Sequence, residues 1–296
     1  MITNSTIGTM GQLGNQLFQY AFLFGQSARQ RRQAFIDADR PGFDLEHFHV
    51  ETGQRVAVVP GHIYAQMYRR EIVASWPERS HLYSPEMAWG ADGCDYAGYF
   101  QSSSYFDDCA SELRKVLRFR RPLHRGAARW KAAIESSSLP VVSVHVRRGD
   151  YLLAPRLLVN LHTTDYYERA LAVLRRTFPD GFKPVIFSDD IGWCESSGFL
   201  SSYPDPLFIA GTDRISDLYL MSQCHHHVIA NSSFSWWGAW LSTHHQQLVI
   251  APREWFGPDG NSEWHTIYRS GWIVIESRRL HPAKTANPSR QSRRVV

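Results

Sequence analysis

Short apolar segments alternate with amphipathic ones through the second half of the chain. In segment 141–146, valines at every second position alternate with Ser143 and His145, which predicts a strand with one buried face. Apolar residues at helical spacing predict helices that start near 127, 165, 213 and 234, and Asp165 with Glu168 resembles a capping box. Further short apolar strands are expected at 184–188, 207–210, 228–230 and 248–251. Strands that alternate with helices are typical of an α/β protein with a doubly wound parallel sheet.

The first half carries a weaker pattern. We expect a weak strand at 2–9, a glycine-containing turn at 11–16, and then a helix at 17–31, a strand at 33–37 and a helix at 107–117. Segment 41–98 is irregular and aromatic, which suits a sugar-binding surface and a loop-rich core equally well. The basic, proline-containing stretch 118–125 is interpreted as a linker. The sequence therefore predicts two domains, 1–125 and 138–277, followed by a tail, 278–296.

Charge is unevenly distributed along the 296 residues, of which 43% are hydrophobic and 13% aromatic. The net charge is +4, but the tail 278–296 contains six Lys and Arg residues and no acid, so the remainder carries a net charge of −2. A body with this charge is not expected to bind nucleic acid, and its arginines need a local explanation. The tail is expected to be disordered, and its basic residues suggest either a solvated end or a weak peripheral contact with an anionic membrane surface.

Cysteine usage and hydropathy bear on the compartment. The four cysteines form no Cys-x-x-Cys pair, so reduced structural thiols are expected. The first eleven residues lack the basic and apolar regions of a signal peptide, and no run of eighteen apolar residues occurs. We therefore expect a cytoplasmic protein, and the two interpretations of the tail leave open whether it also contacts the inner membrane face.

Three polar clusters follow three of the predicted strands. The carboxyl ends of parallel strands lie at the same edge of a sheet, so these clusters are expected to converge there. Arginine supplies charge for a phosphate or diphosphate, carboxylates accept hydrogen bonds from sugar hydroxyls or guanine, and a helix N-terminus offers backbone N–H groups. The combination suggests a nucleotide diphosphate held without an obligatory metal. The clusters contain His145, Arg147, Arg148 and Asp150; Ser188, Asp189 and Asp190; and Asn231, Ser232, Ser233 and Phe234.

Each of these residues also has a purely structural interpretation. Ser232 or Asp189 could serve only as a helix cap, and His145 could be a core histidine whose hydrogen bonds are satisfied. Side chains of adjacent strand residues point to opposite faces, so we expect one of the two arginines to face the ligand and the other to serve structure. Convergence of all three clusters at one edge favours the functional interpretation. The run 225–227 is three histidines, but neighbours in a strand point apart, so a metal site there is not expected.

Three motifs together resemble the signatures of the bacterial and animal α-1,2-fucosyltransferases, glycosyltransferase family 11. They occur in that family's order and, with flanking segments, span about residues 8 to 256. The motifs are Gly11-x-x-Gly14-Asn15-Gln16-Leu17-Phe18-Gln19-Tyr20-Ala21, His145-Val146-Arg147-Arg148-Gly149-Asp150-Tyr151 and Asn231-Ser232-Ser233-Phe234-Ser235-Trp236-Trp237-Gly238-Ala239.

The resemblance implies a GT-B fold, in which two Rossmann-like domains face a central cleft. It implies GDP-fucose as donor, an oligosaccharide acceptor, inversion at the anomeric carbon and no metal or other cofactor. Domain 1–125 would then be the acceptor-side domain and 138–277 the GDP-sugar-binding domain. The polar start of the chain, 3–9, departs from the family's apolar first strand.

The resemblance also implies roles for single residues. Arg147 would hold the β-phosphate and His145 would lie beside the nucleotide, while an aspartate of the Asp189–Asp190 type would contact guanine. The segment 232–234 would line the diphosphate. Asn15, within the loop that includes Gly14 and Gln16, would face the fucose from the other domain.

The mechanism expected from these residues is electrostatic. Arg147 and the helix N-terminus at Ser232 would stabilise the charge that grows on the leaving diphosphate. Asp150 is the first candidate for the base that accepts the proton of the acceptor hydroxyl, although it could equally serve only to orient Arg147 or Arg148 through an ion pair. The alternatives are a transferase of the same fold that uses another GDP-sugar, and a non-catalytic glycan-binding protein.

Overall fold

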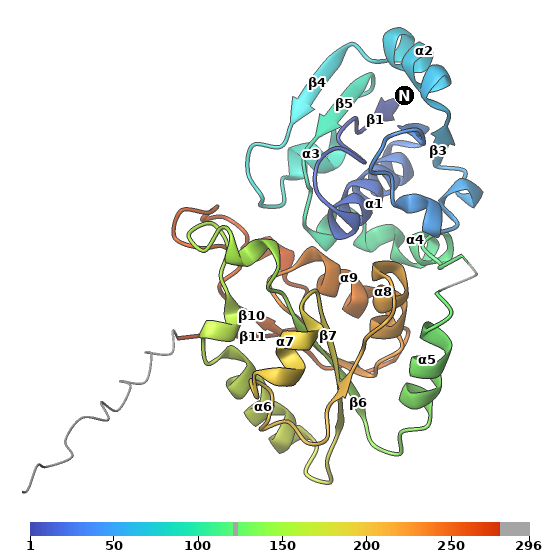
Figure 1. Ribbon diagram of the computed structural model, residues 1–296. Helices are drawn as coiled ribbons and strands as arrows, with labels where there is room; N and C mark the ends of the chain where they lie inside the picture. Colours follow the sequence, from blue (N-terminus) through green and yellow to red (C-terminus); the bar gives the residue numbers. More distant parts are fainter. Residues whose placement is uncertain (121–123, 279–296) are drawn as a thin grey trace, which may run out of the picture.

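Two parallel sheets, one in each half of the chain, form the framework of the protein. The computed structural model describes residues 1–120 and 124–278, and the predicted tail lies almost wholly outside the described residues (Figure 1). The first sheet has the strand order β3-β2-β1-β5-β4 and the second has the order β11-β10-β9-β6-β7-β8. All of their paired strands run parallel. The two sheets lie on either side of the predicted linker, of which residues 121–123 are not described.

The first half contains short strands and one long helix. Its strands are β1 (Ile2–Thr3), β2 (Ala34–Asp37), β3 (Val56–Val59), β4 (Ala74–Pro77) and β5 (Cys94–Ala97). Its helices are α1 (Leu13–Gln30), α2 (Gly61–Glu71), α3 (Pro85–Trp89) and α4 (Ala110–Val116), with 3₁₀ turns at Leu45–His47, Val50–Thr52, Ser103–Tyr105 and Asp107–Cys109. The predicted strand at 2–9 is therefore reduced to two residues, because the polar side chains that follow bind elsewhere. Ser5, for example, donates from its hydroxyl to Asp95 Oδ2 at 2.6 Å.

The second half follows the predicted alternation more closely. Its strands are β6 (Val141–Val146), β7 (Lys183–Ser188), β8 (Leu207–Phe208), β9 (His226–Val228), β10 (Val249–Pro252) and β11 (Ile273–Ile275). Its helices are α5 (Ala127–Glu135), α6 (Tyr166–Thr177), α7 (Ile191–Ser196), α8 (Arg214–Ser222) and α9 (Ser233–Leu241), with 3₁₀ turns at Asp150–Leu152, Leu161–Thr163 and His265–Ile267. Strand β11 was not predicted, and β9 begins and ends two residues before the expected segment.

Two local predictions in this half are wrong. Strand β6 pairs with β7 and β9 in the middle of the sheet and is buried on both faces, since Val142, Val144 and Val146 belong to the same core cluster as α6, and Val141 to the same cluster as α5 and α8. Its polar residues are buried with the valines, and Ser143 Oγ lies 2.7 Å from His227 Nδ1. The capping box at the start of α6 is also absent. The side chain of Asp165 makes no cap bond to that helix and instead accepts the backbone N–H of Arg278 at 2.7 Å.

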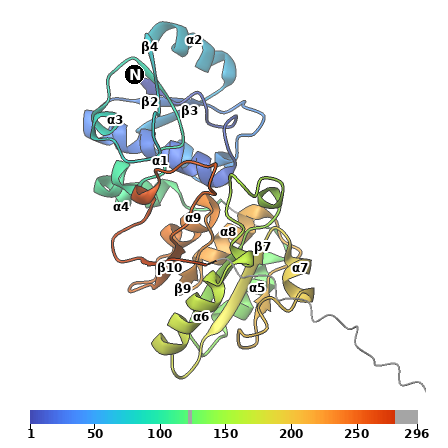
Figure 2. The ribbon, with the colours of Figure 1, turned by 90° about the vertical axis from the view of Figure 1, so that its left-hand side faces the viewer.

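The two halves share one apolar core. Helix α1 is buried along most of its length and lies beside α9 of the second half, as both views show (Figures 1 and 2). The ring of Phe18 on α1 lies 4.5 Å from Trp236 and 5.1 Å from Trp237 of α9, and Phe106 stacks on Trp237 at 5.6 Å. Because aromatic side chains of both halves interdigitate here, the starts of α1 and α9 are held at fixed relative positions.

Candidate functional site

A hollow of about 500 Å³ lies where the two halves meet. Its walls combine the start of α1, the carboxyl ends of β6 and β7, the start of α9 and the loop after β10. Eleven of the predicted site residues line it: Gly14, Asn15, His145, Arg147, Asp150, Ser188, Asp189, Asn231, Ser232, Ser233 and Phe234. The predicted convergence of three polar clusters therefore takes place, whereas Gln16, Arg148 and Asp190 do not line this hollow.

Arg147 lies between two carboxylates on the floor of the hollow. Its Nη2 donates to Asp150 Oδ1 at 2.6 Å, and its Nη1 lies 3.1 Å from Asp189 Oδ2. The side chain is 19% exposed, so its charge acts in a partly desolvated setting. A guanidinium has five N–H donors, and these two contacts leave others for an anionic ligand. The sequence analysis offered two roles for Asp150, a base or a partner that orients an arginine. The ion pair with Arg147 that the second role requires is present.

Arg148 faces the other way and supports the structure. Its Nε donates to Asp190 Oδ2 at 3.0 Å, and its guanidinium lies 3.5 Å from the ring centroid of Trp193. Asp190 also caps α7 by accepting from the backbone N–H of Trp193. The cap is therefore Asp190 and not Asp189, whose Oδ1 accepts the backbone N–H of Arg148 at 2.9 Å. Neither Arg148 nor Asp190 lines the hollow, and the substrate contacts predicted for them stay predictions.

Two helix N-termini point into the hollow. Helices α1 and α9 begin at Leu13 and Ser233, and neither N-cap side chain bonds to its own helix. A Cβ on Gly14 would lie 2.6 Å from the backbone of Ser233 and Phe234, so glycine is required for the close approach of the two helices and not for a turn. Ser232, the N-cap residue of α9, has its hydroxyl available for a ligand. Free backbone N–H groups and the positive ends of two helix dipoles favour an anion here.

The remaining residues at the strand ends are the buried Asn231 and His145 and the half-buried Ser188. Asn231 donates from Nδ2 to the backbone oxygens of Val159 and Trp255, at 3.2 and 2.8 Å. His145 is fully buried, which lowers its pKa to about 3, and its Nδ1 has no partner among the described residues. It is therefore a neutral ring with an unsatisfied nitrogen, contrary to the alternative of a satisfied core histidine. Ser188 Oγ accepts the backbone N–H of Asp190 at 3.0 Å.

Gln16 reaches the hollow only through other residues. Its amide donates to the backbone oxygen of Gly42 at 2.7 Å and accepts the backbone N–H of Asp44 at 2.9 Å. The buried carboxylate of Asp44 in turn pairs with Arg214, which lines the hollow from α8. In this structure Gln16 therefore has a positioning role across the two halves, and the ligand contact predicted for it stays a prediction.

Sequence reasoning identified the start of α1 but missed the rest of the wall that the first half contributes. Asn15 Oδ1 accepts from Gln101 Nε2 at 2.7 Å, and Gln101 lines the hollow with Tyr99. The turn that carries them is held by Glu78, which accepts the backbone N–H groups of Tyr99 at 2.7 Å and Phe100 at 3.1 Å. Burial raises the pKa of Glu78 to about 7. No short motif in the irregular segment 41–98 marks this carboxylate, so only the fold identifies it.

Asp217 is a second carboxylate that was missed. It lies on α8, lines the hollow and accepts a hydrogen bond from the Thr212 hydroxyl. Burial raises its pKa to about 6. The sequence predicted a helix start near residue 213, and Asp213 does cap α8 by accepting the backbone N–H of Ser216 at 2.7 Å. Asp217, one turn further on, carried no separate signal.

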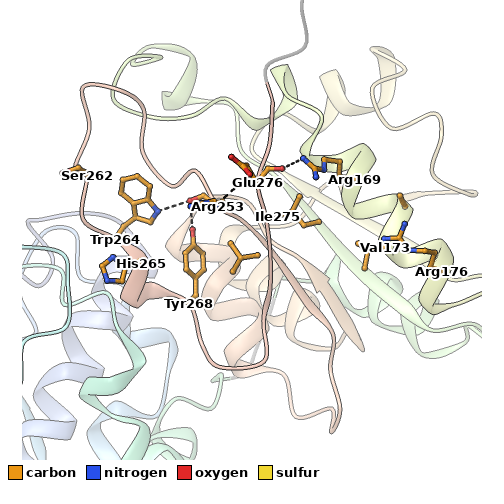
Figure 3. Close-up of a pocket in the computed structure, with 12 residues that line it drawn as sticks. Arg169, Val173, Arg176, Arg253, Ser262, Trp264, His265, Tyr268, Ile275 and Glu276 are labelled. Carbon is orange, nitrogen blue, oxygen red and sulfur yellow. Dashed lines mark hydrogen bonds and ion pairs between the residues drawn. The ribbon is translucent and has the colours of Figure 1, made fainter.

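A larger and more open hollow of about 900 Å³ lies beside α6 (Figure 3). Most of its polar groups already bind the protein. Arg169 donates to the backbone oxygen of Glu276 at 2.6 Å, and Trp264 Nε1 and Tyr268 Oη each lie 3.0 Å from the backbone oxygen of Arg253. None of the three polar clusters reaches this hollow, so the chemistry is better placed in the smaller one.

Clusters of metal-ligating side chains and membrane-spanning helices are the two features that would bear on metal ligation and membrane insertion in the described part of the chain. Within it, no group of three or more His, Cys, Asp or Glu side chains is arranged to hold a metal ion. The histidines of the run 225–227 make separate contacts: His225 and His226 each accept a backbone N–H through Nδ1, and His227 contacts Ser143. In residues 1–120 and 124–278, no helix has the length and apolar character needed to span a bilayer. The membrane contact predicted for the tail concerns residues outside the described part.

Comparison with known proteins gives a consistent result. The family model described as glycosyl transferase family 11 matches residues 82–276. An alpha-1,2-colitosyltransferase of Escherichia coli is 30% identical over 285 residues, which cover 90% of this chain and 97% of that protein. The galactoside 2-alpha-L-fucosyltransferase Sec1 of Mus musculus is 28% identical, with 89% of this chain and 70% of that protein covered. Among solved structures, the fucosyltransferase NodZ from Bradyrhizobium superposes with a TM-score of 0.50 at 15% identity, covering 80% of this chain and 91% of that one. The last likeness shows the fold, which is of the GT-B type.

Proposed function

Because this chain belongs to glycosyl transferase family 11, we propose that it transfers L-fucose from GDP-β-L-fucose to the 2-hydroxyl of a β-galactoside, with inversion and without a metal. The observation that carries the proposal is the pairing of Arg147 with two converging helix N-termini in one hollow. Such a site supplies positive charge where a nucleoside diphosphate would leave. The sugar would then lie toward Asn15, on the wall formed by the first half.

The reaction proposed for this site needs no covalent intermediate. The bond from the anomeric carbon to the GDP oxygen breaks as the acceptor oxygen approaches from the opposite face. Arg147 and the backbone N–H groups at the start of α9 stabilise the electron pair that stays on the diphosphate. The acceptor proton passes to a carboxylate or to water. Asp150 remains our candidate base, because its second oxygen is not used by Arg147 and its side chain is 53% exposed.

A second donor has specific support. The relative of Escherichia coli that is 30% identical over nearly its whole length is named a colitosyltransferase. Colitose is the 3-deoxy counterpart of L-fucose, so one hydroxyl distinguishes the two donor sugars. The same arrangement of Arg147 and helix N-termini suits the diphosphate of either, and the choice depends on the wall that contacts the sugar.

The experiment is to measure GDP release in the presence of EDTA, with GDP-fucose, GDP-colitose or GDP-mannose as donor and with or without lactose. Release from GDP-fucose that lactose stimulates, together with an α-1,2 linkage in the product by NMR, is the expected result. Faster transfer from GDP-colitose than from GDP-fucose would identify colitose, and not fucose, as the donor sugar. Loss of activity in EDTA that Mg²⁺ or Mn²⁺ restores would refute metal independence, and binding of lactose without any GDP release would favour a glycan-binding protein.

A further inference from the structure

A loop of the first half is tied to a loop of the second half at the mouth of the hollow. Ser80 Oγ donates to Glu263 Oε2 at 2.5 Å, and the backbone N–H of Tyr83 donates to Thr266 Oγ1 at 2.8 Å. Between these contacts, the side chains of His81 and Asn261 meet at 2.8 Å. His81 lines the hollow, so a residue of one half is oriented there by a residue of the other.

The hydrogen-bond network sets which ring nitrogen of His81 carries the proton. The backbone N–H of Glu263 donates to Asn261 Oδ1 at 2.8 Å, so the Asn261 amide must direct its NH₂ group toward His81. His81 Nδ1 therefore accepts, and in the neutral ring the proton lies on Nε2. Burial lowers the pKa of His81, which favours the neutral ring. The described residues offer Nε2 no protein partner.

Two aromatic rings flank the imidazole ring of His81. The ring of Phe256 lies edge-on to His81 at 5.5 Å, and that of Tyr99 lies tilted at 5.7 Å. Both also line the hollow. A ring N–H donor with aromatic neighbours in one hollow suits a pyranose, which has apolar C–H faces and hydroxyls at its rim. Within residues 1–120 and 124–278, the side-chain contacts of His81 are with Asn261, Tyr99 and Phe256, none of which is charged, so the arrangement favours a neutral sugar over an anionic group.

We propose that His81, Tyr99 and Phe256 form the subsite for the acceptor sugar, and that His81 donates from Nε2–H to an acceptor hydroxyl other than the one that reacts. The proposal rests on the transferase function proposed above and names residues for its acceptor. Asn261 is a positioning residue that fixes the tautomer. A histidine already protonated at Nε2 cannot take the proton of the attacking hydroxyl, so His81 is a binding residue and not the base.

Kinetics with modified acceptors test the contact. With lactose, His81→Phe should raise the acceptor KM by about three- to tenfold, the value of one hydrogen bond, and leave the KM for GDP-fucose within twofold. His81→Gln can present an N–H near the Nε2 position and should recover part of the loss. With a set of monodeoxy lactoses, the penalty of His81→Phe should vanish for the one analogue that lacks the contacted hydroxyl. His47→Phe, on the half-exposed surface of the first half, is the control and should match the wild type.

The outcomes separate this proposal from the function on which it rests. An equal penalty for every monodeoxy acceptor, an unchanged acceptor KM, or a loss confined to kcat would overturn the role of His81 as a donor. Failure of the wild type to use lactose at all would count against the proposed acceptor. In that case, imidazole ¹⁵N–¹H correlation spectra of the ¹⁵N-labelled protein still show which tautomer His81 adopts, because they need no turnover. A neutral Nε2–H ring that loses this preference in Asn261→Leu supports the proposal, and an Nδ1–H ring overturns it.

Discussion

Replacing Arg147 by lysine tests the electrostatic basis of the proposed reaction. The guanidinium spans two carboxylates, with 2.6 Å from Nη2 to Asp150 and 3.1 Å from Nη1 to Asp189. A lysine ammonium is a single point of charge and cannot hold both carboxylates and still present a fork to a diphosphate. The variant keeps the charge but loses the geometry. Loss of one donor to the developing charge costs about 3 kcal/mol, or about a hundredfold in rate.

The assay is GDP release from GDP-fucose with lactose, from which kcat and both KM values are obtained. We expect Arg147→Lys to lower kcat by about a hundredfold with a smaller effect on the acceptor KM. Its neighbour provides a matched comparison, because Arg148 contacts Asp190 and the Trp193 ring outside the hollow. Arg148→Lys should lower the melting temperature of the protein, whereas its kcat should stay close to that of the wild type. Near-normal turnover by Arg147→Lys, with the wild-type fold shown by circular dichroism, would refute the bidentate role.

Three further variants probe the surroundings of Arg147. Gly14→Ala places a methyl group 2.6 Å from the backbone of α9. We expect about 1–3 kcal/mol of destabilisation in denaturant melts and a loss of activity. Unchanged stability would show that the two helices can move apart to admit the methyl group. Asp217 has its pKa raised by burial from 3.8 to about 6, so it contributes stability below about pH 4 that is lost as the pH rises through 6. Asp217→Asn should remove this dependence, up to about 3 kcal/mol between pH 4 and 8, and parallel stability profiles of variant and wild type would contradict it. Asp150→Asn removes both the ion pair and the proposed base: a drop in kcat that persists at high pH indicates orientation of Arg147, and a drop that is partly recovered at high pH indicates a base.

The amino-acid sequence by itself determined the fold class and the edge of the sheet where polar side chains collect. The alternation of short apolar strands with helices in the second half required a parallel sheet, and parallel strands end at one edge. Local pattern was sufficient for strands β6 and β7 and for the start of α9, because each is an apolar run bounded by polar residues, although it did not show that β6 is buried on both faces. The polar residues near the start of the chain made the bounds of β1 hard to predict. The other strands of the first half are too short to show a clear alternation of apolar and polar residues.

Only the tertiary structure decided which side chains face the hollow. Arg147 and Arg148 are adjacent and chemically identical, and their different environments come from Asp189 in one case and Asp190 with Trp193 in the other. The wall of Tyr99, Gln101 and His81 depends on contacts between residues far apart in the chain, such as His81 with Asn261. Sequence periodicity reports which face of an element is buried. It does not report what that face meets, since the partner is set by how the two halves pack.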